Sequence, residues 1–230
     1  MTFLKTGKTK MVPKNDILTA AQLHILAAFR KKLFSKLTFK DLKELAKTHS
    51  HSRLQNALSK FQKLQLTTKE SVGDVTSYQL NLANNTTVVY LTLIDQQEIR
   101  KNDLLFRLLS QTTGQVEKQT EFFTVLVFGS YAKGQATASS DVDIAIIVEN
   151  DRTKQNVNPE LGIAKRKSLP PADFQVFTRQ EFIDMLRIEE ENVGKEIARN
   201  NFIYYGAESF FKLINKVLNE TARQTLFGTR

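Results

Sequence analysis

The sequence predicts an α+β protein made of two folded parts. The first part, residues 1–95, shows three helix starts in a row and then two extended runs typical of a β-hairpin. The second part, residues 121–230, begins with two apolar, β-branched runs that predict strands of a small mixed sheet with flanking helices. A leucine-rich stretch, residues 96–120, predicts a connecting helix between the two parts.

The composition is typical of a globular protein without membrane spans. Of the 230 residues, 41% are hydrophobic and 25% are charged, and no stretch approaches the roughly 18 uninterrupted apolar residues of a membrane helix. The first residues, MTFLKTGKTKMVPK, are basic but have no apolar core, so no secretion signal is expected. The absence of cysteine excludes disulfides and thiolate metal sites, and it fits a cytoplasmic location.

The net positive charge of +9 lies in the first part of the chain. Residues 1–95 hold 15 Lys and Arg against 6 Asp and Glu, whereas residues 96–230 hold 18 of each kind. A compact basic domain suggests a polyanionic partner, because neutralising phosphates releases condensed counterions. The alternative is a solvated, lysine-rich surface. All three histidines (His24, His49 and His51) also lie in the first part, so chemistry in the second part must proceed without His or Cys.

Capping residues mark the three predicted helices of the first part. Thr19 and Gln22 have the spacing of a capping box, in which each side chain accepts a hydrogen bond from the backbone of the other residue. Thr38 and Asp41 resemble that box, and Ser50 can cap the third helix. The segment LTTKESVGDVTSYQL follows, and its Gly-Asp pair predicts the turn of a hairpin.

Three short helices followed by a hairpin resemble a winged helix-turn-helix domain over roughly residues 15–83. The resemblance implies that the third helix enters the DNA major groove and that the hairpin touches the backbone. The residues then expected at base edges are His51, Ser52, Arg53 and Asn56, and those expected at phosphates are Lys60, Lys63 and Lys69. The alternative is a protein-protein or dimerisation module, and His51 could be an idle surface residue.

The connection between the two parts predicts a strand followed by a helix. Residues 86–94, TTVVYLTLI, are apolar and β-rich and predict a last strand or a buried extended link. The segment from about Asp95 to Gln119 predicts a helix, which is expected to bend or break near Gly114. The domain boundary is therefore expected near residue 95.

Two carboxylates in the second part predict a metal site. The apolar run TVLVF leads into Gly129-Ser130, and ten residues later Asp141-Val142-Asp143 continues as the apolar run IAIIV. Because side chains alternate along a strand, Asp141 and Asp143 should project from one face, roughly 6.5 Å apart. Such a pair needs a hard cation, and oxygen ligands select Mg²⁺ or Mn²⁺.

The Gly-Ser turn predicts a phosphate cradle opposite these carboxylates. Gly129 lets the backbone approach a ligand closely, and the amides that open the next helical turn can point at phosphate oxygens. The Ser130 hydroxyl adds a donor and Lys133 adds a positive charge. A phosphate cradle that faces a two-carboxylate metal site is what nucleotidyl transfer from a nucleoside triphosphate requires.

This segment strongly resembles the DNA polymerase β nucleotidyltransferase superfamily, and in particular its minimal nucleotidyltransferases, whose signature is Gly-Ser, ten residues and Asp-x-Asp. The resemblance spans roughly residues 105–210 and implies a third carboxylate on a neighbouring strand, which Asp173 supplies as a base or metal ligand. The segment NVGKEIARNNFIYYG looks like the family's closing helix and final short strand. The alternatives are a surface loop beside a structural strand for the motif, a helix or turn cap for Asp173, and a merely solvated cluster for Lys165, Arg166 and Lys167.

These observations favour a Mg²⁺-dependent enzyme that transfers a nucleoside monophosphate, AMP from ATP, to a hydroxyl of a protein partner. The resemblance implies an antitoxin-like role toward a HEPN-type ribonuclease toxin, with autoregulatory binding of double-stranded DNA by the first part. Residues 174–230 suggest only two helices after the third carboxylate, so the pocket is expected to have few walls of its own. The alternatives are a transcription regulator that senses nucleotide and a small-molecule (antibiotic) nucleotidyltransferase.

Overall fold

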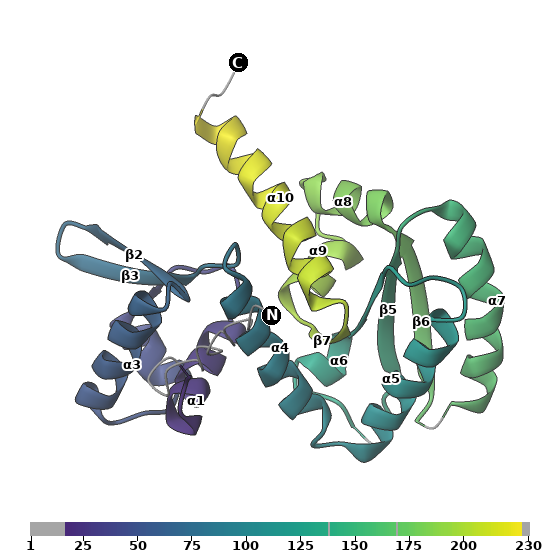
Figure 1. The fold of residues 1–230 in the computed structure, drawn as a ribbon, viewed down its shortest axis with the longest axis horizontal. Coiled ribbons are helices and arrows are strands. Elements are labelled where there is room, and N and C mark those ends of the chain that lie inside the picture. The colour runs from purple at the N-terminus through teal and green to yellow at the C-terminus, as the bar shows by residue number, and fades with distance from the viewer. Residues whose placement is uncertain (1–16, 138, 169, 227–230) are drawn as a thin grey trace, which may run out of the picture.

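The computed structural model describes residues 17–137, 139–168 and 170–226. Figure 1 shows two units joined by one helix: an N-terminal unit, residues 17–83, and a C-terminal unit, residues 103–226, with helix α4 between them. Within the described part of the chain, the helices are too short or too polar to cross a membrane.

The N-terminal unit consists of three helices and a three-stranded antiparallel sheet of order β1-β3-β2. Both predicted capping boxes are present, at Thr19 and Thr38, and the Ser50 side chain caps the third helix as expected. The hairpin is also confirmed, and its turn has Gly73 at φ +57°, the left-handed region that glycine favours. The elements are α1 (Ala20–Arg30), β1 (Leu37–Thr38), α2 (Phe39–Leu45), α3 (His51–Lys63), β2 (Thr67–Val72) and β3 (Val75–Leu80).

The prediction of a strand or extended link at residues 86–94 is wrong, because this run lies inside helix α4 (Asn85–Ile99). Asn84 caps the helix by accepting a hydrogen bond from the Thr86 amide. The side chains that α4 buries include Val88, Leu91 and Ile94, which follow helical rather than alternating spacing. Packing on both units therefore overrides the β preference of the threonines and valines.

The predicted helix at 95–119 is two helices, because α4 ends at Ile99 and α5 runs from Asp103 to Val116. The chain turns at residues 100–102, where the Asn102 side chain accepts hydrogen bonds from the Leu104 and Leu105 amides. Gly114, where a break was expected, lies inside α5. A strong cap therefore decides the position of the break, and an isolated helical glycine costs only about 1 kcal/mol.

The C-terminal unit is built on a four-stranded mixed sheet of order β6-β5-β4-β7. Strands β5 and β6 are parallel and the other neighbours are antiparallel. Both apolar runs of the motif are strands as predicted, and three helices rather than two follow Asp173. The elements are β4 (Phe123–Val127), α6 (Gly129–Ala132), β5 (Val142–Val148), α7 (Asp151–Lys167), β6 (Ala172–Thr178), α8 (Arg179–Arg187), α9 (Val193–Arg199), β7 (Phe202–Tyr205) and α10 (Ala207–Leu226).

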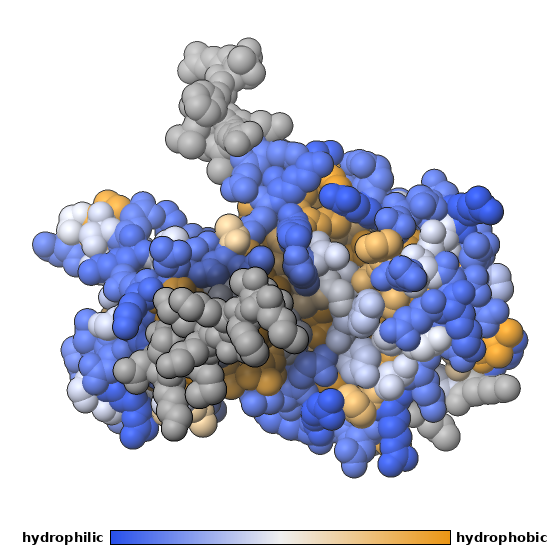
Figure 2. Space-filling model, in the orientation of Figure 1, coloured by the Kyte–Doolittle hydropathy of each residue, from blue (hydrophilic) through white to orange (hydrophobic). Residues whose placement is uncertain are grey.

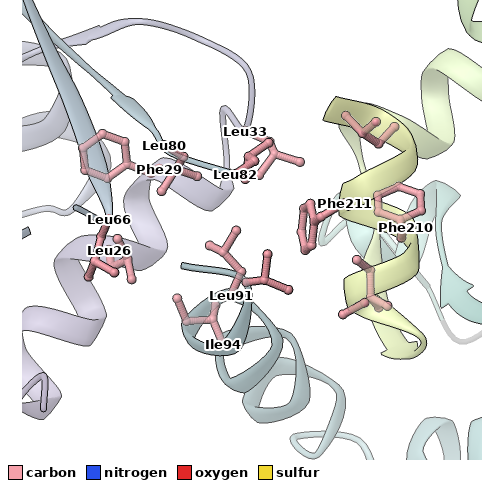
Figure 3. Packing of buried hydrophobic residues seen from close by; sticks show 14 of the residues in the cluster. Leu26, Phe29, Leu33, Leu66, Leu80, Leu82, Leu91, Ile94, Phe210 and Phe211 are labelled. Carbon is pink, nitrogen blue, oxygen red and sulfur yellow. The ribbon is translucent and has the colours of Figure 1, made fainter. Parts of the chain in front are cut away.

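The two faces of this sheet bury different partners. Helices α5 and α7 cover one face, where Leu108 and Leu161 belong to a core that includes Val125. The other face belongs to a continuous core that extends through α4 into the N-terminal unit. Figure 3 shows Leu91 and Ile94 of α4 between apolar residues of the N-terminal unit and Phe210 and Phe211 of α10. The two units therefore share one hydrophobic core.

A buried polar network also ties the units together. Arg30 at the end of α1 donates to both carboxylate oxygens of Asp95 on α4, each over 2.9 Å, and to the backbone carbonyl and side chain of Asn201. The Ile203 amide of β7 donates to the same carboxylate. Asp95 is fully buried and Arg30 is 5% exposed. Burial raises the pKa of Asp95, and the Arg30 guanidinium opposes that effect.

We expect Arg30→Met to lower the free energy of unfolding by about 3–5 kcal/mol, because it leaves the Asp95 charge buried without its partner. The double variant Arg30→Met/Asp95→Leu should recover part of that loss, since no buried charge is left. Lys212→Gln, which breaks the exposed pair with Glu208, is the matched control and should cost under about 1 kcal/mol. Urea unfolding measures all three, and equal effects of the Arg30 and Lys212 changes would contradict the assignment.

Candidate active site

The Gly129 backbone and the Asp143 carboxylate are in close contact. The chain leaves β4 at Phe128, whose amide donates to the Asp143 carbonyl over 2.9 Å, and turns at once into α6. Gly129 has φ +62°, and a Cβ atom at this position would collide with Oδ2 of Asp143. Glycine is therefore required here both for the backbone conformation and for the space that the carboxylate occupies.

The strand register brings the three predicted carboxylates to one end of the sheet. Asp143 on β5 pairs directly with Asp173 on the parallel strand β6, and Asp141 precedes β5 by one residue. Val142, between Asp141 and Asp143, is fully buried, so its side chain points into the core as predicted. The third carboxylate thus lies on the neighbouring strand.

The three carboxylates differ in their electrostatic surroundings. Burial raises the pKa of Asp143, and the negative charges of Asp173, Glu196 and Asp141 raise it further, whereas Lys133 opposes the shift. Asp173 accepts a hydrogen bond from the Lys165 ammonium over 2.6 Å, and this contact lowers the pKa of Asp173. Asp143 is therefore the group whose ionised form most needs an additional cation.

The residues at this end of the sheet fit a hard divalent cation in their chemistry. Within residues 17–137, 139–168 and 170–226, no three acidic or histidine side chains are arranged closely enough to hold a metal ion directly. Lys165 also occupies one oxygen of Asp173. The donors are all carboxylates, which suit Mg²⁺ or Mn²⁺, and the repulsion that raises the pKa of Asp143 is what a cation would relieve.

The predicted phosphate-binding residues surround the same place. Ser130 begins the turn after Gly129, and its carbonyl accepts a hydrogen bond from the Gln135 amide. Lys133 pairs with Glu196 of α9 over 2.6 Å, with both side chains more than a third exposed. Sequence analysis missed the roles of Glu196 and Lys165 as partners, because each pair joins different elements and leaves no local pattern.

A pocket of about 750 Å³ opens beside the turn that carries Lys133. Its walls come from α1 of the N-terminal unit, from the turn between α4 and α5, from residues 131–135 and from residues 199–202. Helices upstream of the motif, and not the segment after Asp173, enclose this space. None of the three carboxylates lines it, so the expectation of few walls around them stays a prediction.

The predicted DNA-contacting residues lie on the surface of the N-terminal unit. Ser52, Arg53, Asn56 and Lys63 are exposed on α3, and Lys69 is exposed on β2. Lys60, also on α3, donates to the Ile17 carbonyl over 2.7 Å, and the His51 ring lies 4.5 Å from the Phe39 ring. Figure 2 shows mainly hydrophilic residues over the visible face of this unit. The assignment of these residues to DNA stays a prediction.

We expect Gly129→Ala to destabilise the protein more than Gly134→Ala does. Both glycines have positive φ, which costs an L-residue about 1–2 kcal/mol, but a Cβ atom at Gly134 meets open space. The collision with Asp143 should add about 1–3 kcal/mol at Gly129. Urea unfolding of the two variants measures the difference, and equal losses would show that Asp143 does not lie against Gly129.

Comparisons with known proteins agree with this geometry. Residues 111–204 match the family described as "Polymerase beta, Nucleotidyltransferase". The chain is also similar to a "putative protein adenylyltransferase" of Methanocaldococcus jannaschii, with 35% identity over 79 residues that make up 32% of this chain and 76% of the relative. Residues 111–204 include the Gly-Ser turn and all three carboxylates. The chain belongs to the polymerase β nucleotidyltransferase family.

Proposed function

We propose that this protein transfers AMP from ATP to a hydroxyl group of a protein partner. The observation that carries the proposal is the in-register pairing of Asp143 with Asp173 beside the Gly129 turn. The similar archaeal protein is described as a "putative protein adenylyltransferase", and this description supports both the adenylyl donor and the protein acceptor.

In this proposal Asp141, Asp143 and Asp173 would hold Mg²⁺ or Mn²⁺, with their side chains closer together than they are in this structure. The metal would supply positive charge to the triphosphate and to the leaving pyrophosphate. Gly129 lets the backbone approach the phosphates, and Lys133 and the Ser130 hydroxyl donate hydrogen bonds to them. Lys133 leaves Glu196 to do so, at a small cost because the pair is exposed.

The transfer step is a displacement at the α-phosphorus of ATP. The acceptor oxygen forms a bond to that phosphorus while the bond to the β-phosphate oxygen breaks, so pyrophosphate leaves and the acceptor gains AMP. The hydroxyl proton passes to Asp173 or to solvent. Since Lys165 lowers the pKa of Asp173 and weakens it as a base, the Lys165–Asp173 pair must open before Asp173 accepts the proton.

The N-terminal unit serves in this proposal as a winged helix that binds double-stranded DNA. Its order of three helices and a hairpin, and the exposed polar face of α3, support that role. With a HEPN-type toxin as the modified partner, the protein is an antitoxin that regulates its own operon.

The pocket beside Lys133 favours a second candidate, a small-molecule acceptor. It has the volume of an ordinary ligand site and has walls within the chain itself. A small alcohol held there could take the place of the protein hydroxyl.

We expect Asp143→Asn to abolish transfer without destabilising the metal-free protein. Because the pKa of Asp143 is higher in the folded protein than in the unfolded chain, ionised Asp143 lowers the free energy of unfolding. This loss develops as the pH rises from the ordinary aspartate pKa through the raised pKa of the folded state. Asparagine removes this cost at neutral pH. Labelling with radioactive ATP and Mg²⁺, in the presence of the co-expressed product of the neighbouring gene, tests transfer. Thermal unfolding with and without Mg²⁺ tests whether the metal stabilises the wild type but not the variant. Undiminished labelling by the variant would reject the assigned site.

Asp173→Ala should slow transfer by about 10²–10⁴-fold, as expected for loss of a general base, while weakening ATP binding less than Asp143→Asn does. Single-turnover rates and equilibrium binding of ATP separate the two effects. If both variants lose the same nucleotide affinity, Asp173 only holds the metal.

Mass spectrometry should locate the added AMP on a tyrosine of the partner, and turnover of a small alcohol instead would support the second candidate.

For the N-terminal unit, we expect Lys63→Ala in the full chain to weaken binding to every duplex and to reduce the salt slope by about one unit. Arg53→Ala should instead reduce the preference for a cognate site by about 1–3 kcal/mol. Fluorescence anisotropy at several salt concentrations measures both effects, with Lys212→Ala of α10 as the control. If the full chain does not bind DNA at low salt and instead forms dimers, the N-terminal unit is a protein-protein interaction module.

A further inference from the structure

Phe122 places a phenyl ring in water directly before strand β4. Its side chain is 67% exposed, whereas the next residue, Phe123, is buried at the start of the strand. The Phe122 amide donates to the Thr120 hydroxyl over 3.2 Å, and this bond helps to fix the bend that leads into β4. A single exposed apolar residue is ordinary on a protein surface, so the surroundings of the ring decide what it does.

A hollow of about 220 Å³ adjoins the Phe122 ring, which forms part of its wall. Its apolar lining includes the buried residues Phe123, Ile147, Phe210 and Leu213. An apolar cavity of about 150 Å³ can already hold benzene, so this hollow has room for one phenyl ring. It is smaller than the roughly 300–1,000 Å³ of sites for drug-sized ligands. Its size therefore favours a side chain over a small molecule.

The charges around the hollow complement the residue that precedes Phe122. Arg179, at the start of α8, lines the hollow and forms no ion pair with another residue that the structure describes. Lys212 and Glu149 complete the charged rim, and Lys212 is already paired within α10. Glu121 is exposed and has no ion pair within the described part of the chain. An incoming Glu121-Phe122 segment would thus bring a carboxylate to the free guanidinium.

The hollow lies at the end of the sheet opposite the three carboxylates. Phe123 at the start of β4 pairs with Val148 at the end of β5, whereas Val127 pairs with Ile144, which follows Asp143. All the described residues that line the hollow belong to the C-terminal unit. A ring in the hollow therefore contacts neither the carboxylates nor the proposed DNA-binding face.

We propose that Phe122 and the hollow beside it form an interface between two copies of this chain, in which the Phe122 ring of each copy enters the hollow of the other. Because the ring and the hollow adjoin on one surface, a two-fold axis close to Phe122 satisfies both contacts at once. Arg179 of each copy then faces Glu121 of the other. Two phenyl anchors make a small contact, so the dimer is weak and forms at micromolar concentrations.

The first test gives the interface its own fluorescent reporter. The chain contains no tryptophan, so Phe122→Trp introduces a single indole at this position. Sedimentation velocity of the wild type and of this variant, from micromolar to about 100 µM, measures dimerisation. The tryptophan emission should shift to the blue as dimers form, because the indole leaves water for apolar surroundings. Dimers without this shift would overturn the assigned contact.

A wild-type chain that stays monomeric up to about 100 µM would overturn the second copy as the occupant. The hollow would then be left to a side chain of a different protein.

The ring and the hollow can also be removed separately. Phe122→Ala should weaken dimerisation by about 10³-fold, because one aromatic anchor contributes roughly 30-fold or more and the dimer contains two. Ser209→Trp, at the rim, should block the hollow and prevent dimerisation while Phe122 is intact. Both positions are exposed, so thermal unfolding of the monomer should not change. Leu104→Ala removes a similarly exposed apolar side chain outside the hollow and is the matched control. A Phe122→Ala chain that dimerises like the wild type would overturn the proposal.

Exchange of the two charges tests the pairing across the axis. Glu121→Arg or Arg179→Glu alone should weaken the dimer by up to about 25-fold, since each of two exposed pairs contributes up to about fivefold. The double variant Glu121→Arg/Arg179→Glu should recover the affinity, because opposite charges face one another again. Glu44→Arg, on α2 of the N-terminal unit, is the control and should have no effect. A double variant no tighter than the single ones would contradict the two-fold arrangement.

Discussion

The buried contact between Arg30 and Asp95 is the constraint on which the arrangement of the two units depends. Both charges lie in an apolar interior, where either one without its partner would cost several kcal/mol. Any movement that separates α1 from α4 therefore exposes apolar core and breaks this pair at the same time. The network continues through Asn201 to β7, so α1 is held against this edge strand of the sheet. The carboxylates lie on the other side of the same sheet, at β5 and β6.

The carboxylate end of the sheet is balanced by the chain's own lysines. Lys165 binds Asp173, so its ammonium group takes the place that a metal ion would have beside this carboxylate. Lys133 binds Glu196, so the Glu196 carboxylate takes the place that a phosphate would have beside this lysine. Asp143 has no lysine or arginine partner among the residues that the structure describes, and its pKa is raised. Ligand binding at this site is therefore best described as an exchange of ion pairs, which costs little because the pairs are exposed.

The interface between the units also bears on the choice of acceptor. A transferase with an open site has to take its acceptor surface from a partner. This chain forms a pocket of about 750 Å³ with its own N-terminal helix, and that pocket is lined by Lys133 but by none of the three carboxylates. A ligand in that pocket would contact α1, which packs on the helices that carry the proposed DNA-binding face. The proposed DNA-binding face and the pocket beside Lys133 thus share α1.

The sequence by itself determined the elements whose signals are local. The caps at Thr19, Thr38 and Ser50, the hairpin and the two strands that flank the Gly-Ser and Asp-x-Asp motif all depend on residues near one another in the chain, and each was predicted correctly. Family resemblance also placed Asp173 on the strand beside Asp143.

Only the tertiary structure decided the state of residues 86–94, because an apolar β-branched run becomes a helix when two units bury its helical face. The pairs of Arg30 with Asp95 and of Lys133 with Glu196 join residues more than sixty positions apart. The pocket likewise needs four distant segments to meet. No local pattern encodes such contacts, since they arise from how the elements pack rather than from the propensity of any one of them.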